Sequence, residues 1–109
     1  MLAAGLGVSR DPARAAQLFQ GACDEGSLSA YNNLGALYEN GQGVESDPSR
    51  AVTLYRRACE GEVMGGCYNL GMAFMHGTGV PANRARGARL LRRACDGGYQ
   101  DACDELERR

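Results

Sequence analysis

The sequence predicts an all-α protein, a right-handed solenoid of helix–turn–helix units that repeat every 36 residues. The segment LGALYENGQGV at 34–44 recurs as LGMAFMHGTGV at 70–80. The same offset separates Cys23, Cys59 and Cys95. A fixed period of this length is typical of stacked repeats, in which each unit buries its apolar face only against its neighbours. Strand signals are absent, since the chain contains no isoleucine and no alternating apolar run.

Length and composition limit the number of domains and the kinds of partner. A chain of 109 residues forms one domain at most. Its net charge of −1 produces no overall positive potential that would attract nucleic acid. No apolar run is long enough to cross a membrane. We therefore expect neither partner, and we expect a monomer. Residues 1–8 match the tail of a repeat rather than a signal peptide, so we expect a fragment of a longer protein that begins mid-repeat.

The first helix type, helix A, is predicted at about 29–40, 66–76 and 99–108. Apolar residues in these segments recur at spacings of three and four, which places them on one helical face. Gly35 and Gly71 lie inside this helix, where glycine costs about 1 kcal/mol relative to alanine. Because a costly residue recurs at the same position, we expect a neighbouring helix to approach the backbone closely there.

The second helix type, helix B, follows a glycine-rich turn. Asp11 and Asp47 each precede a proline, which is the pairing of an N-cap with proline at the first helical position. In the third copy Asn83 is the expected cap, and Arg84 replaces the proline. Within helix B, alanines lie beside larger apolar residues, a combination that allows two helices to pack closely. We expect five complete helices and, at Met1–Ala4, the remnant of a sixth.

The repeated motif is L-G-x-x-(Y/F)-x-x-G-x-G-V, followed by D-P-x-R-A and then R-A-C-x-x-G. This motif resembles the Sel-one-like repeat, which is related to the tetratricopeptide repeat. The resemblance covers the chain as a partial repeat at 1–28, repeats at about 29–64 and 65–100, and a closing helix at about 99–108. The residues that carry it are Leu34, Gly35, Tyr38, Gly41, Gly43, Val44, Asp47, Arg50, Ala51, Tyr55 and Ala58, then Leu70, Gly71, Phe74, Gly77, Gly79, Val80 and Ala94.

Two positions depart from the repeat pattern. Gly87 stands where the other copies have alanine, and Glu107 stands in register with Gly35 and Gly71. The loss of glycine at 107 is consistent with an array end, where no following helix packs closely. The resemblance implies an α-solenoid adaptor that assembles other proteins. The cysteines narrow it to a disulfide-bonded bacterial subset, in which some members are secreted and a few bind penicillin or are weak β-lactamases.

Four cysteines form two pairs with a spacing of eight, Cys59 with Cys67 and Cys95 with Cys103. In the repeat register each pair joins the end of helix B to the start of the next helix A, where a tight turn brings such positions within disulfide range. Zinc binding and reduced, buried thiols are the alternatives, although zinc sites favour closer spacings and more histidine. We expect two disulfides. We also expect a packed free thiol at Cys23, whose partner position holds a tyrosine.

By analogy with tetratricopeptide domains, the residues beside the repeated leucine and glycine of helix A line a concave groove. Asn33 and Asn69 are a repeated pair there, and an amide can both donate to and accept from a peptide backbone. The alternative for each asparagine is a side-chain hydrogen bond to a helix end or to a neighbouring repeat. For Met72 and Met75 two roles are open: they either form an adaptable apolar patch in the groove or fill the core. The expected peptide-binding residues are Asn32, Asn33, Tyr68, Asn69, Met72 and Met75.

Arginine pairs stand near the ends of two B helices, at 56–57 and 92–93. Cations there complement the helix dipole. We favour this explanation over nucleic-acid binding, because aromatic residues are not interleaved and acidic residues balance the charge. No serine is followed three residues later by lysine, and no nucleophile elbow or metal-hydrolase motif occurs. We therefore predict no catalytic residue, no metal and no cofactor.

The leading hypothesis is a non-enzymatic interaction or scaffold module that binds a peptide or protein in the concave groove. The alternative is a secreted β-lactam or cell-wall-fragment binding protein with weak β-lactamase activity. Paired cysteines persist as disulfides only in oxidising compartments, so the expected location is the periplasm or the exterior of the cell.

Overall fold

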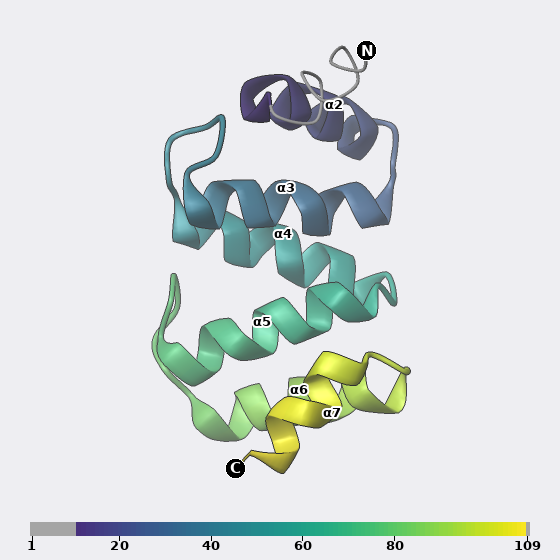
Figure 1. Cartoon of the computed structure of the whole chain (residues 1–109), viewed down its shortest axis with the longest axis vertical. Helices are drawn as coiled ribbons and strands as arrows, with labels where there is room; N and C mark the ends of the chain where they lie inside the picture. Colours follow the sequence, from purple (N-terminus) through teal and green to yellow (C-terminus); the bar gives the residue numbers. More distant parts are fainter. Residues whose placement is uncertain (1–10, 109) are drawn as a thin grey trace, which may run out of the picture.

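The computed structural model describes residues 11–108, and the helix remnant expected at Met1–Ala4 lies outside them. The described chain is a row of helices without a strand (Figure 1). It contains six complete helices rather than the five expected, because all three copies of both helix types form. The B helices are α2 (Pro12–Asp24), α4 (Pro48–Glu60) and α6 (Arg84–Asp96), and the A helices are α3 (Leu28–Asn40), α5 (Met64–His76) and α7 (Gln100–Glu107).

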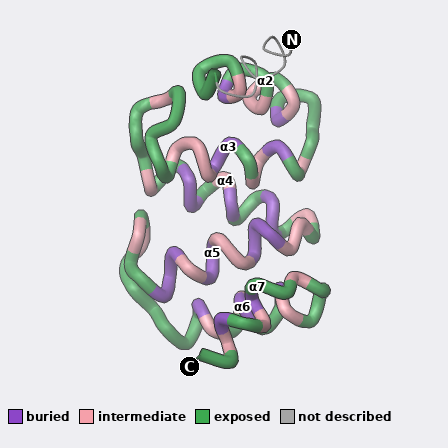
Figure 2. The backbone as a smooth tube through the Cα atoms, in the orientation of Figure 1, coloured by how far each residue is buried: buried purple, intermediate pink, exposed green. Residues whose placement is uncertain are grey.

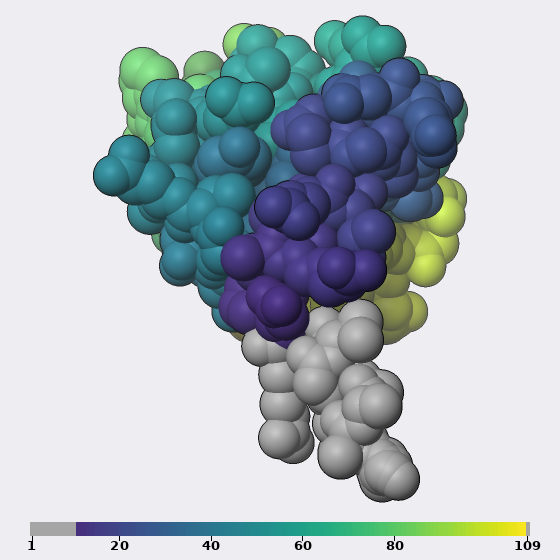
Figure 3. All heavy atoms as spheres, turned by 90° about the horizontal axis from the view of Figure 1, so that it is seen from above, coloured from purple at the N-terminus to yellow at the C-terminus, as the bar shows by residue number. Residues whose placement is uncertain are grey.

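Successive helices stack along one axis, so the molecule measures 45 × 26 × 26 Å. Figure 3 looks along this axis onto the α2 end. The buried positions face neighbouring helices, and the connecting loops are exposed (Figure 2). Leu54 of α4 packs on the core cluster of α2 and α3, and Leu90 of α6 packs on that of α4 and α5. Each unit therefore completes the core of the one before it.

The helix boundaries follow the capping signals of the sequence. The side chains of Asp11, Asp47 and Asn83 accept hydrogen bonds from backbone N–H groups three residues on, at 3.1, 3.1 and 3.0 Å. Capping by Asn83 therefore starts α6 without a proline. Helices α3 and α5 end at Gly41 and Gly77, whose φ angles of 68° and 71° are left-handed. Glycine adopts this conformation at little cost, so it closes each A helix.

The glycines inside the A helices lie against the next B helix. A Cβ at Gly35 would lie 2.7 Å from the ring of Tyr55, and a Cβ at Gly71 would lie 3.0 Å from the carbonyl oxygen of Gly87. Close helix approach, which the sequence predicts, is the reason for these glycines. Gly87 departs from the repeat pattern because a Cβ there would lie 2.7 Å from the sulfur of Met75.

A second glycine in each turn sets the distance between units. Gly43 and Gly79 follow α3 and α5, and their φ angles are 76° and 78°. A Cβ at Gly43 would overlap the backbone of Pro12, and a Cβ at Gly79 would overlap the backbone of Pro48. In Figure 1 the loop after α3 accordingly reaches back toward α2. The turn of one repeat thus rests on the first turn of the preceding B helix.

Candidate functional site

The candidate site is a surface shared by the three A helices. It consists of Asn32 on α3, Tyr68 and Asn69 on α5, and Tyr99 at the start of α7, and we call it the A-face. Asn69 donates from Nδ2 to Oδ1 of Asn32 over 2.8 Å. The rings of Tyr68 and Tyr99 lie with their centroids 5.2 Å apart. All four side chains are half-buried, so the A-face presents amides and aromatic rings that solvent still reaches.

The amide pair and the tyrosine pair adjoin each other. Gly65 of α5 lies between them, since a Cβ there would be 3.1 Å from Nδ2 of Asn32 and 3.4 Å from a ring carbon of Tyr99. The absence of a side chain at 65 lets both groups approach α5. The A-face is therefore one continuous surface rather than two separate pairs.

Side chains meet across the A helices at a separation of 37 residues, one beyond the repeat period. Asn69 bonds Asn32, and Glu105 lies near enough to Tyr68 for its charge to act on that hydroxyl. Asn69 thus makes the bond to a neighbouring repeat that the sequence left open as an alternative. Asn33, its register equivalent, is exposed on α3, and the structure shows no hydrogen bond to its side chain within 11–108.

The hydroxyl of Tyr68 on the A-face stays protonated at physiological pH. Burial raises the pKa of Tyr68 above its ordinary value, and the negative charges of Glu105 and Asp101 raise it further, against a smaller opposing effect of Arg108. The hydroxyl therefore remains a hydrogen-bond donor. The A-face next to α7 has a negative field, which disfavours an acidic segment there.

The methionines are placed differently from the rest of the predicted set. Met75 was wrongly predicted to line a groove, since it is only 8% exposed and packs in the core with Leu91. The small Gly87 makes the space that it fills. Met72 is half-buried against the same cluster. Sequence reasoning also missed Tyr99, whose one signal was an aromatic residue at the cap of a closing helix.

The structure contains both disulfides that the sequence predicts. The Cα atoms of Cys59 and Cys67 are 4.5 Å apart, and those of Cys95 and Cys103 are 4.8 Å apart. Each bond joins the end of a B helix to the next A helix. Cys23 is a free thiol that is 3% exposed, and burial, followed by a neighbouring aspartate, raises its pKa. A buried, protonated thiol is unreactive.

The thiol count gives a simple test of this pairing. Oxidised protein unfolded in guanidinium chloride should react with one equivalent of a thiol reagent, and the native protein should react with almost none, because only Cys23 is unpaired and it is buried. The measurement is absorbance after mixing with an aromatic disulfide reagent. Three or five equivalents from unfolded protein would show that one or both disulfides are absent.

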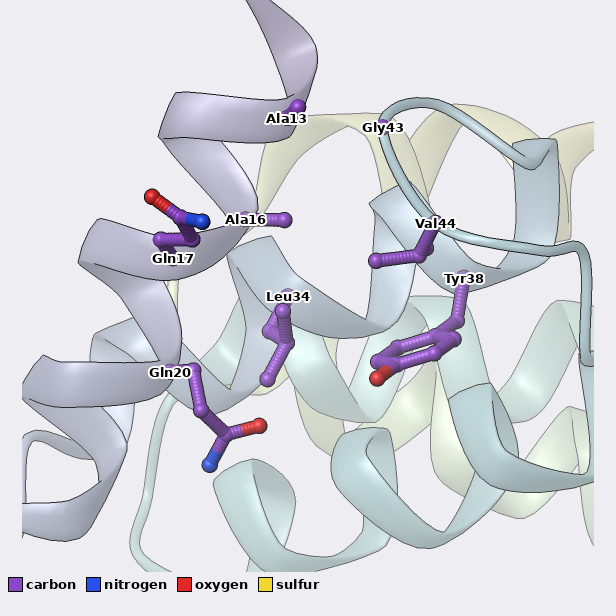
Figure 4. Close-up of a pocket in the computed structure, with 8 residues that line it drawn as sticks. All are labelled: Ala13, Ala16, Gln17, Gln20, Leu34, Tyr38, Gly43 and Val44. Carbon is purple, nitrogen blue, oxygen red and sulfur yellow. The ribbon is translucent and has the colours of Figure 1, made fainter.

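Neither a metal site nor a membrane span emerges from residues 11–108. No group of three or more metal-ligating side chains gathers there. None of the helices in that range is long and apolar enough to cross a bilayer. A recess of about 210 Å³, which no A-face residue lines, lies between α2, α3 and the loop after α3 (Figure 4). Its lining carries no charge and consists of Ala13, Ala16, Gln17, Gln20, Leu34, Tyr38, Gly43 and Val44.

A row of helix pairs with shared cores and a fixed offset between units defines an α-solenoid repeat protein. The family model of the Sel1 repeat matches residues 1–27, 28–62 and 65–99, which is most of the chain. The chain therefore belongs to the Sel1 repeat family. No curated protein matches it by sequence.

Solved structures show the same fold. A protective antigen of uropathogenic Escherichia coli with the SLR fold superposes with a TM-score of 0.86 at 30% identity, over 94% of this chain and 22% of that one. Cysteine-rich protein B of Helicobacter pylori gives 0.76 at 34% identity, over 82% and 67%. A Sel1 repeat protein of Oxalobacter formigenes gives 0.76 at 26% identity, over 80% and 35%. This chain thus spans about a fifth of the E. coli antigen.

Proposed function

We propose that this protein is a non-enzymatic interaction module that binds an extended segment of another protein on the A-face. Sel1 repeat proteins are generally protein-interaction scaffolds. The observation that carries the proposal is the Asn32–Asn69 amide pair directly beside the Tyr68–Tyr99 ring pair. One pair offers hydrogen bonds to a backbone, and the other offers a surface for an apolar side chain.

The amide pair has bonding capacity that the fold does not use. Their mutual bond takes one N–H of Asn69 and one lone pair of Asn32. The NH₂ group of Asn32 and the carbonyl oxygen of Asn69 are then available to a peptide N–H and C=O. Because the pair holds itself in place, less side-chain entropy is lost when a peptide binds. Asn33 adds a further exposed amide on α3.

We place this activity in the periplasm or outside the cell, in a monomer. The two disulfides support that compartment, because cytosolic thiol systems keep such bonds reduced. The similarity to a cysteine-rich protein of H. pylori agrees with it. Each bond fixes an A helix to the B helix before it, so an oxidising compartment would hold α5 and α7, which carry Tyr68, Asn69 and Tyr99 of the A-face, in place.

Peptides selected from a random phage-displayed library on the immobilised protein provide the probe for this proposal. Asn69→Ala should weaken a selected peptide by about 1–2 kcal/mol, since the peptide loses a partner and Asn32 loses its support. Tyr68→Ala should weaken it by about 1–3 kcal/mol through lost ring contact. Titration calorimetry measures both, and thermal melts monitor folding. Gln17→Ala on the exposed side of α2 is the control and should bind normally.

Two results would overturn the proposal. Peptides that bind Asn69→Ala and Tyr68→Ala as tightly as the parent protein would place recognition elsewhere on the array. Turnover of the β-lactam nitrocefin above the buffer rate, lost in an A-face variant, would replace the interaction module by the enzymatic alternative, a β-lactam or cell-wall-fragment binder. No observation within residues 11–108 favours that alternative.

A further inference from the structure

A second surface, on α4 and α6, concentrates positive charge. It comprises Arg56 on α4 and Arg86, Arg89, Arg92 and Arg93 on α6, all exposed, and we call it the arginine patch. Three acidic residues lie among these five arginines, so the patch has an excess of two positive charges on a chain whose net charge is −1. The acidic residues are Glu60, Glu62 and Asp96.

The arginine patch surrounds a recess with an apolar floor. A cavity of about 160 Å³ lies between α4, α5 and α6. Leu70 and Leu90 line it together with the arginines at 56, 86 and 93, and Cys59 and Glu60 complete the lining. A second, more open recess of about 370 Å³ adjoins it through Arg93. The first recess is large enough for one apolar side chain, with guanidinium groups around its edge.

Two of the arginines are held in place by the fold. The guanidinium of Arg86 lies over the ring of Phe74, 4.8 Å from its centroid. Arg93 donates to the carbonyl oxygen of Cys59 at 3.4 Å and forms an ion pair with Glu62 at 2.7 Å. Ordered guanidinium groups lose little further side-chain freedom when an anion binds.

The charges of the other three arginines are not neutralised by ion pairs. Within residues 11–108, the side chains of Arg56, Arg89 and Arg92 make no ion pair and no side-chain hydrogen bond. The helix dipole does not account for the whole patch either. Arg93 is in the last turn of α6, but Arg86 is in the first turn, where a positive charge is unfavourable and no acidic residue compensates it.

Three of the five arginines, at positions 56, 89 and 92, lie outside the repeat motif, whereas Arg86 and Arg93 are in register with Arg50 and Arg57 of the motif. The register position of Gln20 on α2 becomes Arg56 on α4 and Arg92 on α6. The position of Gln17 becomes a threonine and then Arg89. Positive charge therefore accumulates toward the C-terminal B helix while the scaffold stays the same.

We propose that the arginine patch binds an acidic protein segment, with an apolar side chain in the recess and flanking carboxylates on Arg56, Arg86 and Arg89. Guanidinium groups pair with carboxylates in bidentate geometry, and the leucine floor gives the segment a hydrophobic anchor. A protein segment fits better than a nucleic acid, because no aromatic residue among 11–108 is fully exposed for base stacking. The carboxylates of the patch also oppose a dense row of phosphates. This inference does not depend on the A-face.

The probe is a fluorescein-labelled peptide with a central leucine and two glutamates on each side, titrated by fluorescence anisotropy at low salt. The double variant Arg56→Gln and Arg89→Gln should bind at least about fivefold more weakly than the parent protein. The matched control, Arg14→Gln with Arg84→Gln, removes the same charge from B-helix positions outside the patch, and both of its arginines are exposed. It should bind within about twofold of the parent, as should Tyr68→Ala on the A-face.

The peptide controls separate the two parts of the site. Replacing the central leucine by alanine should weaken binding by about threefold or more, and replacing the glutamates by glutamine should abolish it. Equal loss in both double variants would show non-specific attraction and overturn the proposal. Tighter binding of a single-stranded oligonucleotide or of anionic vesicles, lost in the Arg56 and Arg89 variant, would also overturn it and assign the patch to that ligand. Self-association through this patch would do the same.

Discussion

Replacement of Gly79 by alanine should lower the free energy of unfolding by about 3 kcal/mol. The φ angle of 78° costs an L-residue about 1–2 kcal/mol, and the new Cβ would overlap the carbonyl group of Pro48, which adds about 1–3 kcal/mol of overpacking. Backbone atoms at the start of α4 cannot rotate aside as a flexible side chain can. Urea denaturation followed by circular dichroism measures the change.

Gly98→Ala is the matched control for this prediction. Gly98 is also exposed and has a φ angle of 95°, but nothing lies within 4 Å of a Cβ built there. The control therefore carries the conformational cost without the overlap, and it should lose about 1–2 kcal/mol. If both variants lose the same stability, the turn after α5 does not rest tightly on α4, and the proposed spacing of the units is wrong.

Removal of the Cys59–Cys67 disulfide by a double alanine substitution should lower the free energy of unfolding by about 2–3 kcal/mol in the chain-entropy model. The loss should exceed that for Cys95–Cys103, although both bonds close loops of equal length. The reason is packing, because Cys59 and Cys67 are 3% and 0% exposed whereas the second pair is half-buried.

Thermal melts with and without a reducing agent measure this effect for the two double variants. The reductant should destabilise the parent protein through both bonds and each variant through the one that remains. The reverse order of stabilities would mean that the bond nearer the C-terminus is the more important one. No loss in either variant would mean that the bonds do not constrain the unfolded chain.

The fold followed from the sequence because its signals are local and repeated. A cap such as Asp47, a closing glycine such as Gly77 and a helix glycine such as Gly35 each act within one or two turns, and the register shows each of them more than once. The eight-residue cysteine spacing is equally local. The tight contact of Gly79 with Pro48 has no such local signal, because it joins two units.

The candidate site was only partly predictable, since it depends on contacts between repeats. Asn69 pairs with Asn32 at a separation of 37 rather than 36, so exact register pointed to Asn33 instead. Met75 is buried because its neighbour in α6 is Gly87. In the copy that has Ala51 at that position, Glu39 stands in register with Met75 and accepts a 2.6 Å hydrogen bond from the hydroxyl of the buried Tyr55. Compensating residue changes on two neighbouring helices cannot be recognised from the repeat pattern alone.

We propose the A-face as the peptide-binding surface. Amide chemical-shift mapping of the ¹⁵N-labelled protein, titrated with a library-selected peptide, tests it most directly. The largest shifts should lie around Asn32, Gly65, Tyr68 and Asn69 and at the start of α7, with small shifts along α2. The largest shifts along α2, α4 and α6 with an unperturbed Asn32–Asn69 pair would contradict it.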